Sequence, residues 1–458
     1  RLFTESDQDI FSQFSGDKNP IHLDANEARK TVSGECIVHG IHAILWMFEC
    51  FIGRQNYFFN CFDISFLHFI RINEIVFCNF DIKNNCITLT NEENIILIQI
   101  KCTEQISNTK LEKNSGLLNF NNQIDLPKKL EINDIVEGEN IDKFYGGKEK
   151  YGRVLFSKLI NKINSNIIFE IALLSNLVGM QIPGLNSLLY ECKISFSETN
   201  KYQSCNIKTI DKRFKFVKLK YQGINFNSLI TAFFRPTSKP ILKCHEIKRT
   251  KESNIKLSGK KALIIGGSRG IGAWVAKILA INAIDVTITY KSGKLEAEEI
   301  LNDISCENKN NCNLVELDIT KVDDYKKLIH RYDYFYYFAT PKIFVKKSSE
   351  FDSKLFEHFN LFYCNAFKTI SELLIKNGVR KILFPSTVAI DKPIIELKEY
   401  IEAKKNGEKT CDYLKNKYKI EVFNPRIDRV LTDQTTSVMP VNSEEPLNIA
   451  INLVNLMK

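Results

Sequence analysis

A glycine-rich loop in the second half of the chain constrains the fold more than any other feature. The loop, GGSRGIG at 266–272, lies between a short apolar run at 261–265 and an apolar helical pattern at 273–280, and another strand pattern follows at 285–290. Glycines at this spacing allow a tight turn and let a pyrophosphate reach the N-terminus of the helix. The sequence therefore predicts a βαβ unit that binds a dinucleotide. The candidate cofactor-binding residues of the loop are Gly266, Ser268, Arg269, Gly270, Ile271 and Gly272.

The end of the following strand distinguishes the two forms of the cofactor. An NAD site usually has an acidic residue there, which binds the ribose hydroxyls. This chain has Tyr290, Lys291 and Ser292 instead, and Arg269 lies in the loop itself. Because cationic residues at these positions suit a 2′-phosphate, the sequence predicts NADP(H), with Lys291 as a cofactor-binding residue.

A Tyr-x-x-x-Lys pattern lies farther along the chain, at Tyr400 and Lys404. On a helix these two side chains share one face, one turn apart. A nearby ammonium favours tyrosinate, so we expect a lowered pKa for Tyr400 and proton exchange with a substrate oxygen near neutral pH. Thr387, at the end of the strand-like run 381–386, has a hydroxyl that could hold the carbonyl while hydride arrives. The alternative for Tyr400 and Lys404 is a solvated helix face.

Together these features resemble the short-chain dehydrogenase/reductase family, close to its 3-oxoacyl reductases, from Leu257 to the C-terminus. The resemblance implies that Thr387, Tyr400 and Lys404 are catalytic. It also implies two further roles by position. Asn360 would complete a proton relay, and Asp318 would contact the adenine.

Two departures from this family's pattern weaken the expectation of efficient reduction. The family's catalytic serine position is Thr387 here, with Ser386 beside it. A threonine can still donate the required hydrogen bond. The family's Asn-Asn-Ala-Gly segment appears as YFAT at 337–340, which makes the strand end that supports the cofactor bulkier. The sequence therefore leaves open whether a domain that binds NADP also reduces at full rate.

The N-terminal part carries a second set of residues suited to acid/base chemistry. Asp17 and His22 lie in the run SGDKNPIHLD at 15–24, on either side of an Asn-Pro bend. The bend lets the carboxylate and the imidazole point into one pocket, where they can hold a water and move its proton to and from a carbon. Gly40 precedes the apolar run 41–52 and offers bare backbone N–H to a substrate carbonyl. The alternative is a turn or cap role for Asp17 and a core role for His22.

This order of residues resembles the MaoC-like (R)-specific enoyl-CoA hydratase and 3-hydroxyacyl dehydratase family. The family signature runs Ser-Gly-Asp-x-Asn-Pro-x-His, followed later by His-Gly. The resemblance implies a hot-dog fold, an acyl-thioester substrate, Asp17 and His22 as the catalytic pair, and the Gly40 N–H as the oxyanion donor.

An internal repeat relates two parts of the first half. An apolar helix pattern followed by a short strand motif occurs twice, as 41–52 with DISF at 63–66 and as 171–180 with KISF at 193–196, so both motifs recur at an offset of 130 residues (193 − 63). The alternating segments that follow predict antiparallel strands. One long helix wrapped by such strands is a hot-dog unit, so the repeat predicts a double hot dog.

The two copies of the repeat differ in their chemistry. At the same offset Asp17 corresponds to Gly147 and His22 to Gly152, so we expect only the first copy to be catalytic. The second copy contains the segment 178–187, which resembles the Pro-Gly-x-x-Ser segment that borders the substrate in the MaoC-like family. Its alternative is an ordinary turn that joins helix to strand.

The length of the chain, 458 residues, exceeds one ordinary core and predicts several domains. We expect an α+β double hot dog followed by an α/β Rossmann-type doubly wound parallel sheet. The predicted parts are a catalytic hot dog at 1–125, a degenerate hot dog at 126–240, a linker at 241–257 and a short-chain dehydrogenase/reductase domain at 258–458.

Charge and cysteine usage narrow the partners. The net charge of +9 is spread along the chain, which favours coenzyme A, NADP or an acidic acyl carrier protein over nucleic acid. Thirteen cysteines without a C-x-x-C pair favour free thiols in a reducing cytoplasm and no metal site. Polar residues interrupt the apolar stretches, so no membrane span is expected. Both family resemblances imply a homo-oligomer.

We therefore expect a bifunctional acyl-thioester enzyme. The first site would interconvert 2-enoyl and (R)-3-hydroxyacyl thioesters, and the second would reduce a 3-oxoacyl thioester with NADPH. Two alternatives remain from the sequence. The reductase domain could act on a sugar or another carbonyl, and the hot-dog half could be a non-catalytic acyl-binding module.

Overall fold

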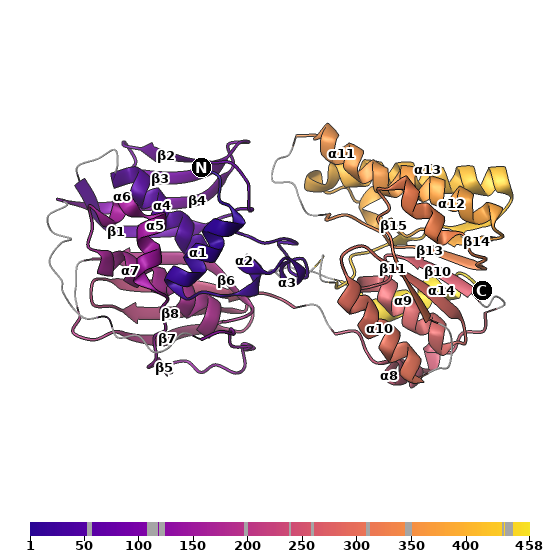
Figure 1. The fold of residues 1–458 in the computed structure, drawn as a ribbon, viewed down its shortest axis with the longest axis horizontal. Helices are drawn as coiled ribbons and strands as arrows, with labels where there is room; N and C mark the ends of the chain where they lie inside the picture. Colours follow the sequence, from indigo (N-terminus) through magenta and orange to yellow (C-terminus); the bar gives the residue numbers. More distant parts are fainter. Residues whose placement is uncertain are drawn as a thin grey trace. The chain divides into compact units, whose positions relative to one another are not determined.

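The chain forms two compact units, one of Arg1–Thr237 and one that begins at Ser238. This computed structural model describes residues 1–52, 57–107, 118, 124–196, 200–237, 240–257, 261–307, 312–343, 350–432, 435 and 443–458. The first unit is built on a nine-stranded antiparallel sheet and the second on a six-stranded parallel sheet (Figure 1). A two-stranded sheet, β15 (Ser386–Thr387) with β17 (Arg426–Ile427), completes the second unit.

Two long helices are each followed by four strands in the first unit. The first set is α4 (Gly40–Ile52), β1 (Tyr57–Phe66), β2 (Val76–Asp81), β3 (Cys86–Asn91) and β4 (Ile96–Ser107). The second set is α7 (Ser165–Asn176), β6 (Ser187–Ser195), β7 (Ser204–Asp211), β8 (Phe216–Gln222) and β9 (Asn227–Phe234). The sheet order is β2-β3-β4-β1-β6-β9-β8-β7, with β5 (Asn140–Ile141) at the edge, so the second set mirrors the first. The shorter helices α1 (Glu5–Ser15), α2 (Pro20–Leu23) and α3 (Ala25–Ala28) precede α4 and are counted, with the residues between them, in the first set. Helices α5 (Gly152–Leu155) and α6 (Ser157–Ile160), with the residues 140–164 around them, precede α7 and are counted in the second set.

The central strands β1 and β6 join the two sets, and their register reproduces the repeat seen in the sequence. Asp63 lies opposite Lys193, and the flanking pairs are Cys61 with Ser195 and Ser65 with Glu191. At the 130-residue offset Cys61 corresponds to Glu191, and Ser65 corresponds to Ser195. The offset therefore converts one flanking pair into the other. A local two-fold axis passes through the Asp63–Lys193 pair, whose charged atoms lie 3.2 Å apart.

One hydrophobic core runs through both sets. Helix α4 is apolar on nearly every face, and it contacts α7 as well as strands β1, β2 and β3. Buried residues of both helices and of most of the sheet belong to a single cluster. The parts 1–125 and 126–240, predicted as separate domains, therefore form one unit, because each helix is covered partly by the other set.

The second unit has a parallel sheet in the order β12-β11-β10-β13-β14-β16. Its strands are β10 (Lys261–Ile265), β11 (Asp285–Tyr290), β12 (Cys312–Glu316), β13 (Tyr334–Tyr337), β14 (Lys381–Leu383) and β16 (Glu421–Phe423). Alternate residues of β10 enter two different cores, Ala262 and Ile264 in one, Leu263 and Ile265 in the other. Both faces of the sheet are thus covered, and the predicted doubly wound Rossmann-type sheet is confirmed. The strand order reverses between β10 and β13, where such sheets bind their ligands.

Helices supply the two covering layers of this sheet (Figure 1). Helix α9 (Gly270–Ile281) and α14 (Pro446–Asn455) share one core, and α12 (Phe367–Lys376) and α13 (Lys398–Tyr418) share the other. The remaining helices are α8 (Cys244–Lys248), α10 (Lys294–Glu307) and α11 (Ser353–Asn360).

The segment 241–257, predicted as a linker, is folded against the second unit. Cys244 and Ile247 of α8 are fully buried in its core. The carboxylate of Asp303 accepts a hydrogen bond of 3.0 Å from the backbone N–H of Cys244 and forms an ion pair of 2.6 Å with Lys277. The linker prediction was wrong because the charged residues of this run surround a few apolar positions that face the core.

Candidate active sites

Two helix ends position Asp17 and His22. Helix α1 ends at Ser15, and Gly16 follows in the left-handed conformation at φ +76°, which turns the chain at Asp17. The side chain of Asn19 then caps α2, whose first residue is Pro20. The bend that the Asn-Pro pair predicts is confirmed, and it separates the two candidate residues by one tight turn.

The Asp17 carboxylate is buried and hydrogen-bonded on both oxygens. Its Oδ2 accepts a bond of 2.7 Å from the hydroxyl of Ser175, and its Oδ1 accepts a bond of 3.0 Å from the backbone N–H of Asn19. Burial raises the pKa of Asp17 to about 6, and the two hydrogen bonds only partly oppose this rise. The group can therefore gain or lose a proton close to neutral pH.

The His22 ring has one nitrogen engaged and one available. Its Nδ1 lies 2.8 Å from the carbonyl oxygen of Ile37, so Nδ1–H donates and Nε2 keeps its lone pair. The ring stacks on His39, with 3.8 Å between the ring centroids. Burial lowers the pKa of His22 to about 4, which leaves a neutral imidazole at pH 7. Neutral His22 has the form that a general base requires.

Asp17, His22 and His39 converge on one point. Their carboxylate and ring-nitrogen donor atoms all lie within 4.8 Å of one another, a separation that one bridging water can span. The same donor types occur in metal sites. In His39, however, Nδ1 already lies 2.9 Å from Gln8 Oε1 and Nε2 lies 3.2 Å from the Asp17 carbonyl oxygen. This engagement of His39 favours a water held by Asp17 and His22 over a metal ion.

Gly40 begins α4 directly after His39. As the first residue of the helix, it has a backbone N–H that no intrahelical carbonyl can accept. A Cβ at this position would lie 2.6 Å from the ring of Phe66, so the local packing requires glycine. The position is compatible with the predicted oxyanion donor.

The second set of the first unit closes the site behind Asp17. Helix α7 supplies Ser175 and continues into a π-helical turn at 177–181. A Cβ on Gly179 in this turn would lie 2.5 Å from both carboxylate oxygens of Asp17. Asn19 Nδ2 donates to the carbonyl oxygens of Gly179 at 2.8 Å and Gly184 at 3.1 Å. The segment 178–187 therefore lies against the turn that carries Asp17 and His22. The sequence singled out the segment that contains Gly179 but missed Ser175, because only the fold brings that residue to Asp17.

Gly147 and Gly152, which correspond to Asp17 and His22 in the second set, pack against helix α1. A Cβ on Gly147 would lie 2.0 Å from the backbone oxygen of Gln13, and one on Gly152 would lie 2.5 Å from the ring of Phe14. Both glycines thus allow close approach to α1.

In the second unit, the glycine loop lies against the neighbouring strand end. Gly266 has φ +78°, and a Cβ there would lie 2.9 Å from the backbone nitrogen of Ala339, just after β13. A Cβ on Gly272 would lie 2.2 Å from the oxygen of Gly266. Ser268 is buried, Arg269 precedes the first residue of α9, which is Gly270, and Ile271 packs on the core. This tight strand–loop–helix leaves bare backbone at a helix N-terminus, which fits the pyrophosphate of a dinucleotide.

Lys291 and Asp318, both predicted to contact the cofactor, form an ion pair of 2.9 Å. Lys291 follows β11 and its side chain is exposed. Burial acts to raise the pKa of Asp318, but the bonds to Lys291 and Thr320 outweigh it and hold the value at about 2. A 2′-phosphate bound by Lys291 would therefore compete with the Asp318 carboxylate.

Tyr400 and Lys404 lie one turn apart on α13, and both are buried. The solvated-face alternative is wrong for these two residues. Lys404 Nζ donates a bond of 2.8 Å to the Pro385 oxygen and lies 4.1 Å from the ring centroid of Tyr363. Burial lowers the pKa of Lys404 to about 7.

The protonation of Tyr400 differs from the expectation. Burial raises its pKa to about 12, although a hydrogen bond with Thr387 opposes the rise. The expected lowering was wrong in this state because the loss of hydration around the phenol outweighs the effect of an ammonium that burial itself drives toward neutrality.

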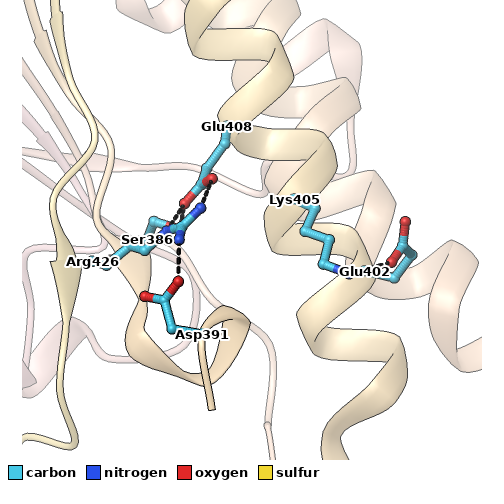
Figure 2. Close-up of polar contacts among 6 residues, drawn as sticks. All are labelled: Ser386, Asp391, Glu402, Lys405, Glu408 and Arg426. Carbon is cyan, nitrogen blue, oxygen red and sulfur yellow. Dashed lines mark hydrogen bonds and ion pairs between the residues drawn. The ribbon is translucent and has the colours of Figure 1, made fainter. Parts of the chain in front are cut away.

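The two residues of strand β15, Ser386 and Thr387, both carry hydroxyl groups, but they point to different partners. Thr387 hydrogen-bonds to Tyr400, whereas Ser386 Oγ donates to Glu408 on α13. Figure 2 shows Glu408 held by Arg426, with contacts of 2.8 and 2.7 Å, while Arg426 also binds Asp391. Because side chains alternate along a strand, only Thr387 faces the tyrosine. Sequence reasoning missed this ionic support beneath the site.

Asn360 ends α11 where a π-helical turn, 361–366, begins. Its side-chain oxygen accepts a bond of 3.1 Å from Asn406 on α13. Tyr363 in the turn hydrogen-bonds to Thr340, and its ring lies edge-on to Tyr400, with 5.7 Å between centroids. The altered segment after β13 is therefore tied to the tyrosine site through Tyr363, a residue that no sequence pattern singled out.

Comparison with known families separates the two units. Residues 1–94 match the family model described as the MaoC like domain. The chain thus carries a MaoC-like domain at its N-terminus, which includes Asp17, His22 and Gly40. Residues 262–437, in the second unit, match the family model described as the NAD dependent epimerase/dehydratase family.

Individual relatives each match only part of the chain. A hydroxynaphthalene reductase-like protein, Arp2, from Metarhizium brunneum is 33% identical over 79 residues, which cover 17% of this chain and 29% of that protein. The chain thus spans less than a third of this curated relative. Among solved structures, the oxidoreductase yciK from E. coli is 17% identical, covers 46% of this chain and 92% of its own, and has a TM-score of 0.41. An alcohol dehydrogenase from Thermococcus sibiricus, complexed with 5-hydroxy-NADP, is 18% identical, covers 43% and 89%, and has a TM-score of 0.38.

Among the described helices, none combines the length and the apolarity that crossing a membrane would demand.

Proposed function

We propose that the MaoC-like domain adds water to, or removes it from, acyl thioesters, interconverting 2-enoyl and (R)-3-hydroxyacyl forms. The proposal rests on the convergence of Asp17 and His22 within water-bridging distance in a buried site. The mirrored topology of the first unit supports a double hot dog in which one half carries this chemistry.

The geometry divides the proton transfers between the two residues. In hydration, neutral His22 accepts a proton from the held water through Nε2, and the water oxygen bonds to C3 of the enoyl group. Asp17 in its protonated form gives a proton to C2. The Gly40 N–H stabilises the enolate oxygen that forms at the thioester carbonyl. Dehydration runs through the same steps in reverse.

The second unit, in this proposal, reduces a 3-oxoacyl thioester to the 3-hydroxyacyl form that the first site uses. NADP(H) bound at the loop 266–272 would supply the hydride. Thr387 orients the substrate carbonyl, and Tyr400 donates a proton to its oxygen. Lys404 stabilises the resulting tyrosinate, and Asn360 connects the site to solvent. Lys291 and Arg269 would hold the 2′-phosphate, and Asp318 the adenine.

A second candidate for this unit is another carbonyl, such as that of a sugar. The match of residues 262–437 to the epimerase/dehydratase model favours testing it. NADPH oxidation with acetoacetyl-CoA, compared with a panel of keto-sugars, distinguishes the two substrates.

The decisive experiment for the first site is hydration of crotonyl-CoA by the purified full chain. Loss of the ultraviolet absorbance of the enoyl thioester, with (R)-3-hydroxybutyryl-CoA identified by chiral chromatography, is expected. Absence of turnover on crotonyl-CoA and longer enoyl thioesters would contradict the proposal and favour an acyl-binding module. We further propose CoA or acyl carrier protein as the thioester carrier, a cytoplasmic location and a homo-oligomer.

A further inference from the structure

A buried guanidinium lies next to the catalytic turn of the MaoC-like domain. Arg235 directly follows β9, and only 7% of its surface is exposed. Its backbone N–H donates to Asn186 and its Nη2 donates to the carbonyl oxygen of Leu185 at 2.8 Å. Its Nη1 is also buried, and among the described residues it has no hydrogen-bond partner. One arm of the guanidinium is therefore anchored, and the other is a buried donor without a hydrogen-bond partner among the described residues.

The guanidinium of Arg235 lies next to the turn that carries Asp17 and His22. The Leu185 oxygen that anchors Arg235 also accepts a bond of 3.3 Å from Asn19 Nδ2, and Asn19 stands in the turn between Asp17 and His22. The charge of Arg235 is one of the causes that lower the pKa of His22. The guanidinium thus acts on the catalytic imidazole from the side formed by the second set of strands.

The charge on Arg235 is uncompensated. Burial lowers its pKa only to about 10, so it remains a cation at neutral pH. The ion pairs of the described residues include none that involves Arg235. A buried cation without a counter-charge is costly, and an anionic ligand removes that cost. The neutral thioester carbonyl already has a donor in Gly40.

We propose that Arg235 binds a carboxylate carried by the acyl chain, so that the substrate of the first site is an acyl thioester with an acidic acyl group. This inference rests on the proposed hydration chemistry and specifies its substrate class. A phosphate of the carrier would offer similar oxygens. The pantetheine arm, however, separates every such phosphate from the thioester, whereas Arg235 lies beside the residues that act on C2 and C3.

The test compares a series of 2-enoyl thioesters of dicarboxylic acids with monocarboxylic thioesters of the same chain lengths. Each acyl group is presented both on CoA and on N-acetylcysteamine, which lacks phosphate. The full chain is assayed as the wild type, Arg235→Gln, Arg235→Lys and the control Arg213→Gln, whose guanidinium is exposed and lies over Phe214. Thermal unfolding of each variant reports whether it is folded.

In the wild type we expect a dicarboxylic thioester to be preferred on both carriers. Arg235→Gln should raise the KM for that substrate roughly 10- to 100-fold, with little change for the monocarboxylic partner. Arg235→Lys should retain part of the preference, and Arg213→Gln all of it.

Four other patterns overturn the inference. If Arg235→Gln raises the KM for every CoA thioester, whatever its acyl group, and for none of the N-acetylcysteamine thioesters, then Arg235 binds a phosphate of CoA. An equal loss on all substrates, or no loss, assigns it a structural role. A wild type that hydrates none of the thioesters overturns both this inference and the proposed function. Activity on monocarboxylic thioesters alone overturns the inference and leaves the proposed hydration standing.

Discussion

The two sets of the first unit use equivalent positions in opposite ways. In the first set, the turn after α1 carries Asp17 and His22, and both point to a common site. In the second set, Gly147 and Gly152 occupy the corresponding positions and lie in close contact with α1. The two sets share one topology, but only the first set has a carboxylate and an imidazole at these positions. The second set has glycines there, which pack against α1.

The second set nevertheless takes part in the site. Ser175 binds the Asp17 carboxylate, and Gly179 makes room for it. The two sets also share one core and one central strand pair. The second set therefore supports the side chain of Asp17, which belongs to the first set. The following predictions test this division of roles between the two sets, beginning with the largest effect.

Replacement of the Asp17 carboxylate should impair hydration by the first unit and leave the reaction of the second unit unchanged. We expect Asp17→Asn to lower kcat for enoyl-thioester hydration roughly 10²- to 10⁴-fold, because the amide cannot transfer the proton. NADPH oxidation by the second unit should be unchanged. Asp63→Asn, at a half-exposed carboxylate of the same unit that is paired with Lys193, is the matched control and should hydrate normally. Equal hydration by Asp17→Asn and the wild type would refute the division.

Two glycine variants should separate catalysis from stability. Gly179→Ala places a methyl 2.5 Å from the Asp17 oxygens, so we expect kcat for hydration to fall about 100-fold through displacement of the carboxylate. Gly147→Ala places a methyl 2.0 Å from a backbone oxygen of α1, so the free energy of unfolding should fall by about 1–3 kcal/mol. Kinetics and urea unfolding of both variants provide the measurements. If Gly147→Ala lowered kcat as much as Gly179→Ala, the two roles would not be separate.

The pH dependence should show the contribution of Ser175. Hydration requires protonated Asp17 and neutral His22, so kcat/KM of the wild type should fall below about pH 4 and above about pH 6. The bond from Ser175 lowers the pKa of Asp17, so Ser175→Ala should raise that pKa and move the upper limb to higher pH. Because Asp17 and His22 lie close together, the two limbs of the pH profile describe the titration of the pair and not of either residue alone. An upper limb that stays in place, or moves to lower pH, would show that Ser175 does not act on Asp17.

The smallest effect is expected at the junction of the two sets. Asp63 and Lys193 form an ion pair on the local two-fold axis, and about half of each side chain is exposed. Lys193→Met should change the free energy of unfolding by less than about 1 kcal/mol, because solvent screens the pair. Urea unfolding at low and high salt measures this. A loss of several kcal/mol would mean that charge, and not the shared core, joins the two sets.

Local sequence signals determined much of the molecule. The glycine loop predicted β10, α9 and β11, because a buried strand, a tight turn and an apolar helix each need only neighbouring residues. The Asn-Pro bend placed Asp17 and His22 together for the same reason. The 130-residue offset predicted two equivalent helix-and-strand sets, and the alternating segments predicted the antiparallel strands that follow each helix.

The tertiary structure decided everything that depends on burial and on distant neighbours. Ser175 and Gly179 reach Asp17 only through the packing of α7, more than 150 residues along the chain. The pKa of Tyr400 rises instead of falling because α13 buries both Tyr400 and Lys404, and the cost of dehydrating a charge is invisible in a Tyr-x-x-x-Lys spacing. The buried Nη1 of Arg235, unpartnered among the described residues, likewise depends on the packing of the second set against the turn that carries Asp17 and His22. Local sequence signals indicated the candidate groups, and the fold set their protonation and their surroundings.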